Sequence, residues 1–181
     1  GYVPPPCEHD GDATLDGNVD VLDVVFVVGM ILGTVTDYTE VNFCHADVTL
    51  DDSVDVLDVV SIVGTILEGR VMNAGSAELI LQDKGINLNA DGYVGAVQIS
   101  LSHGPDFVIE LTETAMVADY HTVDNRTTLI IVAPENGSLF STNGSFNIEY
   151  AFAASENGYI DVNIAGEYSL LEAYPNPFNP I

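Results

Sequence analysis

Acidic side chains recur at a fixed spacing in two short segments of this 181-residue chain. Residues 12–23 read DATLDGNVDVLD and residues 47–58 read DVTLDDSVDVLD, so aspartate fills positions 1, 5, 9 and 12 of both segments. Calcium takes about six to eight oxygen ligands, and a tightly wound loop presents alternate side chains and the backbone carbonyl of position 7 to one ion. The spacing therefore predicts two calcium ions. The predicted ligands are Asp12, Thr14, Asp16, Asn18, Asp20 and Asp23 in the first loop, and Asp47, Thr49, Asp51, Ser53, Asp55 and Asp58 in the second.

The two loops open a longer internal repeat. Residues 12–32 and 47–67, aligned at an offset of 35, are identical at 15 of 21 positions, which is typical of one structural unit used twice. An apolar run after each loop predicts a helix over Val21–Leu32 and over Val56–Glu68, each followed by a glycine at its C-terminal cap. Both helices are apolar almost all round, so we expect them to be buried on more than one side.

Residues 12–69 resemble a type I-like dockerin, a calcium module of paired F-hand repeats in which each loop ends in aspartate. The chain departs from that pattern at Thr14, Thr49 and Asp52. The resemblance implies a calcium-dependent fold that binds a cohesin, in either of two orientations related by the repeat. It also implies that the two residues before the last ligand of each loop take part in partner recognition. These residues are Val21, Leu22, Val56 and Leu57. The alternative is that all four cap the core against the chain's own second domain.

From residue 76 the pattern changes to short segments of alternating apolar and polar residues, separated by Asn-Gly and Asp-Gly turns. The predicted strands are residues 77–82, 93–102, 106–113, 127–134, 145–155 and 159–165. Six or more short strands over about 95 residues indicate an antiparallel β-sandwich. The strand order and turns of this part are similar to those of a cohesin. The predicted fold class is therefore α+β with two domains, a small all-α calcium module followed by a cohesin-like sandwich.

The composition limits the partners. The chain has 28 acidic residues against 3 basic ones, a formal net charge of −25, yet 47% of its residues are hydrophobic. Such a hydrophobic content is typical of a folded protein rather than a disordered acidic chain. The charge repels polyanions, so we expect no nucleic acid and no anionic membrane surface as partner. No run reaches the roughly 18 apolar residues that span a bilayer, so we expect no membrane insertion.

Two cysteines, Cys7 and Cys44, each lie just upstream of a repeat. An extracellular setting would favour a disulfide between them; the alternative is two reduced, buried thiols. His9 and His45 stand beside the cysteines, which makes a transition-metal site conceivable. The spacing matches no zinc pattern, however, and structural roles for the two histidines remain the alternative.

The C-terminal sequence AYPNPFNPI resembles the opening of the C-terminal sorting domain of type IX-secreted bacterial proteins. That resemblance implies a secreted protein at the surface of a bacterial cell; the alternative is an ordinary proline-rich tail. Because residue 1 is followed directly by YVPPP, we expect a mature, already processed chain. The predicted organisation is an extended segment over 1–11, a dockerin-like domain over 12–72, a cohesin-like sandwich over 76–168 and an extended tail over 169–181.

No nucleophile elbow, phosphate-binding loop or close carboxylate pair for glycoside hydrolysis is recognisable in the sequence, so we expect no enzymatic activity. A dockerin and a cohesin-like sandwich in one chain predict calcium-dependent docking between copies, head to tail, into a filament or surface layer. One alternative is an adaptor that tethers to a separate cohesin-bearing scaffold. Others are a monomer with both domains packed together, and a carbohydrate-binding module, against which the absence of tryptophan counts.

Overall fold

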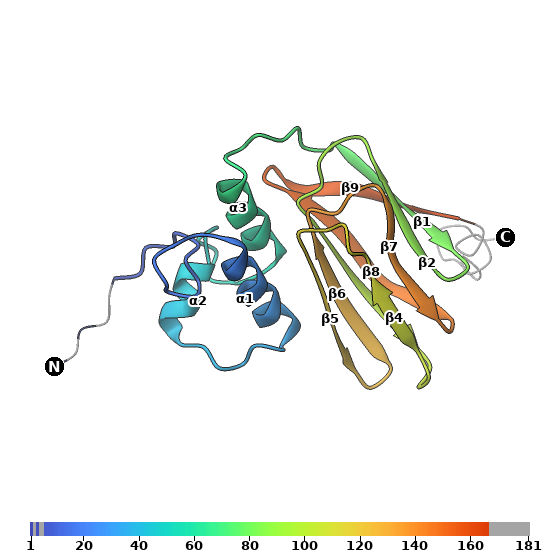
Figure 1. Ribbon diagram of the computed structural model, residues 1–181, viewed down its shortest axis with the longest axis horizontal. Helices are drawn as coiled ribbons and strands as arrows, with labels where there is room; N and C mark the ends of the chain where they lie inside the picture. The colour runs from blue at the N-terminus through green and yellow to red at the C-terminus, as the bar shows by residue number, and fades with distance from the viewer. Residues whose placement is uncertain (2, 4–5, 167–181) are drawn as a thin grey trace.

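The computed structural model describes residues 1, 3 and 6–166 and begins with a small helical unit (Figure 1). Its helices are α1 (Val21–Leu32), α2 (Glu40–Ala46) and α3 (Val56–Ile66). None of the helices in this part of the chain is long and apolar enough to cross a membrane. The predicted extended tail and its sorting motif lie outside the described residues.

The helices α1 and α3 begin in the same way. Asp20 and Asp55 occupy the N-cap positions, and each side chain accepts a hydrogen bond from the backbone amide two residues later. The aspartate at the third helical position accepts a bond from the cap amide in return, which completes a capping box. As predicted, α1 ends at Leu32 and is capped by Gly33, which is left-handed with a φ of 79°. The other helix ends at Ile66, earlier than the predicted Glu68, because Glu68 has a φ of 55° that a helix does not allow.

The sequence did not predict α2. Its seven residues, EVNFCHA, show no helical apolar period. Thr39 caps the helix by accepting a hydrogen bond from the Asn42 amide at 3.3 Å, and the Asn42 side chain donates to the carbonyl of Ala13 at 2.9 Å. A helix this short is marginal alone, so contacts with the first loop hold it in place.

The second part of the chain contains nine strands within the described residues. They are β1 (Ser76–Gln82), β2 (Gly85–Ala90), β3 (Ala96–His103), β4 (Val108–Leu111), β5 (Val117–Val123), β6 (Arg126–Val132), β7 (Gly137–Asn143), β8 (Phe146–Ser155) and β9 (Gly158–Ala165). All six predicted strands are present, and β2, β5 and β7 were not predicted.

The strands form two facing layers that β9 connects (Figure 1). One layer has the order β4-β7-β2-β1 and the other the order β8-β3-β6-β5. Gly158–Ile160 pairs antiparallel with β8, and Asp161–Ala165 pairs parallel with β1. The prediction of an antiparallel sandwich is therefore wrong for the β1–β9 pair, because β9 leaves one sheet and continues along the first strand of the other. Every other strand pairing in the described chain is antiparallel.

The sandwich core lies between the two layers, and the helices cover the outer face of the second layer. Helix α1 contacts β5 and β6, and α3 contacts β3 and β8. Figure 1 shows the helical unit beside the layer that contains β5 and β6. Ile130 and Val132 of β6 lie in the same buried cluster as Val27 of α1 and Ile62 of α3. The helical unit and the outer face of the sandwich therefore share a buried hydrophobic cluster, separate from the core between the two layers.

Candidate calcium loops and docking surface

The first loop winds around the carboxylate of Asp12. Its Oδ1 accepts a hydrogen bond from the amide of Asp16 at 3.0 Å, and its Oδ2 accepts one from the amide of Gly17 at 2.9 Å. At the far end of the loop, buried Asp23 accepts bonds from both the amide and the hydroxyl of Thr14, each at 2.9 Å. The first and last predicted ligands therefore fix the path of the loop, and the threonine orients the last carboxylate.

The second loop repeats these contacts. Asp47 accepts hydrogen bonds from the amides of Asp51 and Asp52 at 3.2 and 3.1 Å, and Asp58 accepts bonds from the amide and hydroxyl of Thr49 at 3.0 and 2.9 Å. Carboxylate oxygens of Asp47, Asp51 and Asp58 lie within 4.8 Å of one another. The three carboxylates carry like charges, and a divalent cation between them would offset their repulsion. The arrangement offers the hard oxygen donors that calcium prefers.

The predicted ligands differ in their exposure to solvent and in their role at the helix ends. Asp20 and Asp55 accept the N-cap hydrogen bonds of the helices, so their carboxylates are only partly available to an ion. Asp16, Asn18, Thr49, Asp51 and Ser53 are exposed. Burial raises the pKa of Asp58 above its usual value of 3.8, although hydrogen bonds from the amides of Asp55 and Thr49 partly oppose the shift. Calcium binding by all twelve residues stays a prediction.

Both loops contain backbone conformations that L-residues rarely adopt. Position 6 has a φ of 90° at Gly17 and of 65° at Asp52, so the second loop accepts a non-glycine residue at the turn. The sequence did not predict that Leu15 and Leu50 at position 4 also have positive φ, of 64° and 63°. Such residues cost roughly 1–3 kcal/mol each, so other contacts of the loop must offset that strain.

The predicted partner-binding residues lie in different surroundings in the two repeats. Val21 and Leu22 at the start of α1 are 41% and 56% exposed. Val56 at the start of α3 is 1% exposed, and Leu57 is partly buried beside it. The second pair packs against the chain's own sandwich, which matches the alternative stated above for these residues. Partner binding by the first pair stays a prediction.

The contact of α3 with the sandwich extends one turn beyond the predicted pair. Val56 and Val60 form a buried cluster with Ala96 of β3 and Ala154 of β8, and Phe152 packs at its edge. The repeat equivalent of Val60 is Val25, which is 48% exposed. Sequence reasoning missed both valines, although the identical VLDVV segments that contain them were a usable signal.

The C-terminal end of α1 completes the contact with the sheet. The Nδ1 atom of His121 on β5 donates a hydrogen bond to the carbonyl of Leu32 at 2.8 Å, since a carbonyl can only accept. The docked surface therefore combines the start of α3 with the end of α1. The end of α3 also lies against the sandwich, because Gly64 faces the side chain of Glu156 between β8 and β9, whereas the start of α1 is exposed.

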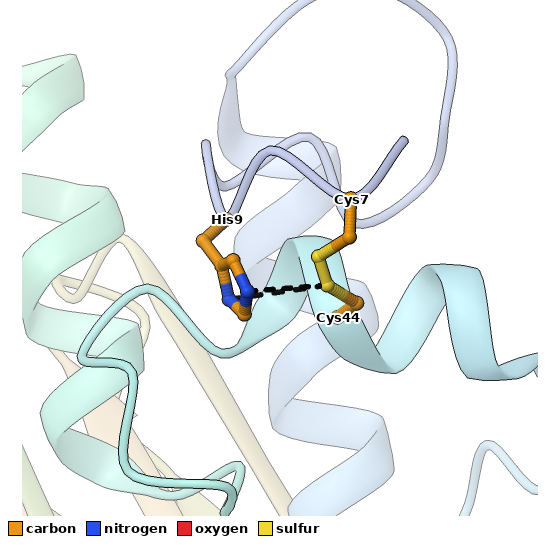
Figure 2. Close-up of side chains that lie close together, drawn as sticks. All are labelled: Cys7, His9 and Cys44. Atoms are coloured by element: carbon orange, nitrogen blue, oxygen red, sulfur yellow. Dashed lines mark hydrogen bonds between the residues drawn. A yellow bond between two sulfur atoms is a disulfide. The ribbon is translucent and has the colours of Figure 1, made fainter. Parts of the chain in front are cut away.

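A disulfide fastens the N-terminal segment to α2 beside the second loop (Figure 2). Cys7 and Cys44 have Cα atoms 5.9 Å apart and are bonded, as the sequence predicted. The Nε2 atom of His9 lies 3.4 Å from the Sγ atom of Cys44, and its Nδ1 atom lies 2.6 Å from the carbonyl oxygen of Asp47. The segment that precedes the first loop is thereby attached to the first residue of the second.

The second histidine of this region strengthens the same attachment. The Nδ1 atom of buried His45 lies 2.6 Å from the carboxylate of Asp10, and the amide of Gly11 donates to the carbonyl of His45 at 3.0 Å. Burial alone would raise the pKa of Asp10, but hydrogen bonds from His45 and from the Asp12 amide outweigh it and hold that pKa below 3.8. These contacts give both histidines structural partners.

A scan against protein-family models gave no match, and a search of curated proteins gave no significant match. Among solved structures, the chain is similar to a non-cellulosomal cohesin from the hyperthermophilic archaeon Archaeoglobus fulgidus. The two share 16% sequence identity over 57% of this chain and 95% of that one, with a TM-score of 0.34. At this identity and TM-score the similarity supports no conclusion about function.

Proposed function

We propose that this chain is a non-enzymatic, secreted assembly protein whose calcium-loaded helical unit docks on the outer face of a β-sandwich. Exchange of that contact between copies would build head-to-tail filaments or a surface layer. The observation that carries the proposal is the burial of Val56 and Val60 against Ala96 and Ala154. The start of a calcium-loop helix thus fits this sheet face closely enough to exclude solvent.

Calcium is proposed to act on docking through the start of α3. The carboxylates of Asp55 and Asp58 cap this helix and at the same time belong to the predicted ligand set. Val56 lies between them in sequence, and Val60 follows two residues after Asp58. An ion that orders the loop would therefore fix the helix turn that carries the docking side chains, whereas mutual repulsion of the unliganded carboxylates would loosen it.

The connection between the two parts gives exchange a simple route. Glu68 and Gly69 turn the chain sharply after α3, with φ values of 55° and 66°, and β1 begins at Ser76. Opening this short hinge would let the helical unit of one copy occupy the sheet of the next, with all docking contacts re-formed. Because the contact joins two different surfaces, repeated exchange produces an open chain of subunits unless its rotation closes a ring.

Light scattering across a range of protein concentrations, in excess calcium and then in chelator, tests this function. We expect the mass to rise with concentration in calcium and to fall after chelation. A chain that stays monomeric at every concentration in calcium would refute exchange. Val60→Asp should weaken assembly, because it places a charge in the docking contact, whereas Val25→Asp is its matched control on the exposed helix.

A second candidate, an adaptor for a separate cohesin-like partner, is favoured by one specific observation. The exposed start of α1 carries the same side chains as the docked start of α3, so it offers an identical surface to another sandwich. Capture of an immobilised cohesin module by the full chain tests this role. Here Val25→Asp should abolish capture and Val60→Asp should spare it, the reverse of the pattern for self-assembly.

A further inference from the structure

A cluster of metal-binding side chains lies outside the calcium loops and the docking surface. The Sγ atoms of Cys7 and Cys44 and a ring nitrogen of His9 all lie within 4.8 Å of one another. Figure 2 shows the imidazole of His9 directed at the sulfur of Cys44. Cys44 belongs to α2, and the other two residues belong to the segment before the first loop.

The hydrogen bond between His9 and the second loop determines which ring nitrogen is free. Its Nδ1 atom lies 2.6 Å from the carbonyl oxygen of Asp47, which can only accept, so Nδ1 carries the proton. The Nε2 atom therefore presents its lone pair, 3.4 Å from the Sγ atom of Cys44. Metal-binding histidines are held in this way, with one ring N–H donated to a carbonyl or carboxylate and the other nitrogen directed at the ion.

The distances suit zinc. A tetrahedral zinc ion lies about 2.3 Å from sulfur and about 2.0 Å from nitrogen, which sets these two ligand atoms roughly 3.5 Å apart. The Nε2–Sγ distance of 3.4 Å is already close to this value. Cys7 is exposed near the start of the chain, so its sulfur has room to separate from Cys44 once the disulfide is broken. Thiolate and imidazole ligands select zinc, whereas calcium prefers oxygen.

We infer that reduction of the disulfide converts this cluster into a zinc site with Cys7, His9 and Cys44 as ligands and a water molecule at the fourth position. A dithiol reductant supplies two electrons and two protons, the S–S bond breaks, and the reductant itself becomes a disulfide. Zinc then displaces the two thiol protons, because thiolates are the ligands. A disulfide oxidant reverses the sequence by taking up the two electrons, and the zinc ion is released as the cysteines rejoin.

The test uses the full chain in saturating calcium, so that the carboxylate loops are already filled. The protein is reduced with a dithiol, desalted without air and titrated with Co²⁺ as a spectroscopic probe. We expect a thiolate-to-cobalt absorption band that saturates at one ion per chain and disappears when Zn²⁺ displaces the cobalt. The oxidised chain should give no such band, and zinc binding to the reduced wild type should release about two protons per ion.

Substitutions identify the ligands. Cys44→Ser should remove the band, and His9→Gln should weaken binding about tenfold or more, by comparison with the loss of supporting residues at metal sites. His103→Gln is the matched control, since His103 lies on β3 and outside the cluster. Circular dichroism checks that each variant is folded. Absence of the thiolate band in the reduced wild type, release of no protons, or wild-type affinity in folded His9→Gln would each overturn the inference.

Discussion

Val25 and Val60 form a matched pair inside one molecule, because the repeat places the same residue at the same helical position in different surroundings. Val60 is 2% exposed and packs with Ala96 and Ala154, whereas Val25 is 48% exposed. Replacing each valine by alanine removes the same atoms and changes the helix propensity equally. A difference between the two variants therefore measures the docking contact of α3 with the sandwich.

The size of the difference follows from the packing. A Cβ atom placed on Gly95 would lie only 2.7 Å from Cγ1 of Val60, so the valine fills the space against that backbone. Val60→Ala removes two buried carbons, at about 0.8 kcal/mol each, and leaves a cavity. We therefore expect the free energy of unfolding to fall by about 2 kcal/mol. The free energy of unfolding of Val25→Ala should stay within about 0.5 kcal/mol of the wild-type value. For a chain of this size, the Val60 variant should melt roughly 4–8 °C lower.

Thermal unfolding followed by circular dichroism in saturating calcium measures both variants, and urea unfolding checks the free energies. Chelated samples serve as a second comparison. If calcium orders the docking turn, its removal should reduce the difference in melting temperature between the two variants. The packing argument would be refuted by equal melting shifts in the two variants, or by a larger shift for Val25→Ala. Either outcome would mean that α3 is not seated on the sheet in solution.

Three further predictions follow from individual sites. A chelator should lower the melting temperature, since free calcium at about 100 times its Kd stabilises the fold by about 2.7 kcal/mol per ion. Asp58→Asn should lose much of this calcium-dependent stabilisation. Asp37→Asn is the control and should keep it, because Asp37 is exposed and lies outside the loops. Burial raises the pKa of Tyr93 from 10.0 to about 12, so stability should fall as pH rises between these values, and Tyr93→Phe should remove that fall in an alkaline unfolding series. Hydrogen bonds from two backbone amides hold the pKa of Asp91 below 3.8, so its contribution is present above that value and is lost on acidification; the stability gap between wild type and Asp91→Asn should narrow at low pH.

The features that the sequence predicted correctly are those set by local interactions. The N-terminal boundaries of α1 and α3 follow from Asp20 and Asp55, which cap the helices through hydrogen bonds within their own turn. The cysteine pairing could also be anticipated, since only two cysteines are present. These features depend on few residues, so type and spacing are enough to predict them.

The features that the sequence missed depend on distant contacts. β2 and β7 carry asparagine and serine between few apolar residues, and they become strands because Ile86 and Phe140 enter the sandwich core together. α2 depends on the bond from Asn42 to the carbonyl of Ala13. The different surroundings of Val25 and Val60 could not be predicted, because both valines end identical VLDVV segments.

What distinguishes the two helices is the way in which each is connected to the sandwich. Shortly after α3, the chain pairs with the segment that leads into β3. There the amide of Tyr93 donates to the carbonyl of Met72 at 2.7 Å, and the amide of Ala74 donates to the carbonyl of Tyr93 at 2.8 Å. That attachment keeps α3 close to β3, so its effective concentration at the docking face exceeds that of α1. On a separate sandwich with an open face, neither helix would have the advantage of this covalent attachment. The start of α1 would then compete with the start of α3 on equal chemical terms, and of these two helix starts only that of α1 is exposed.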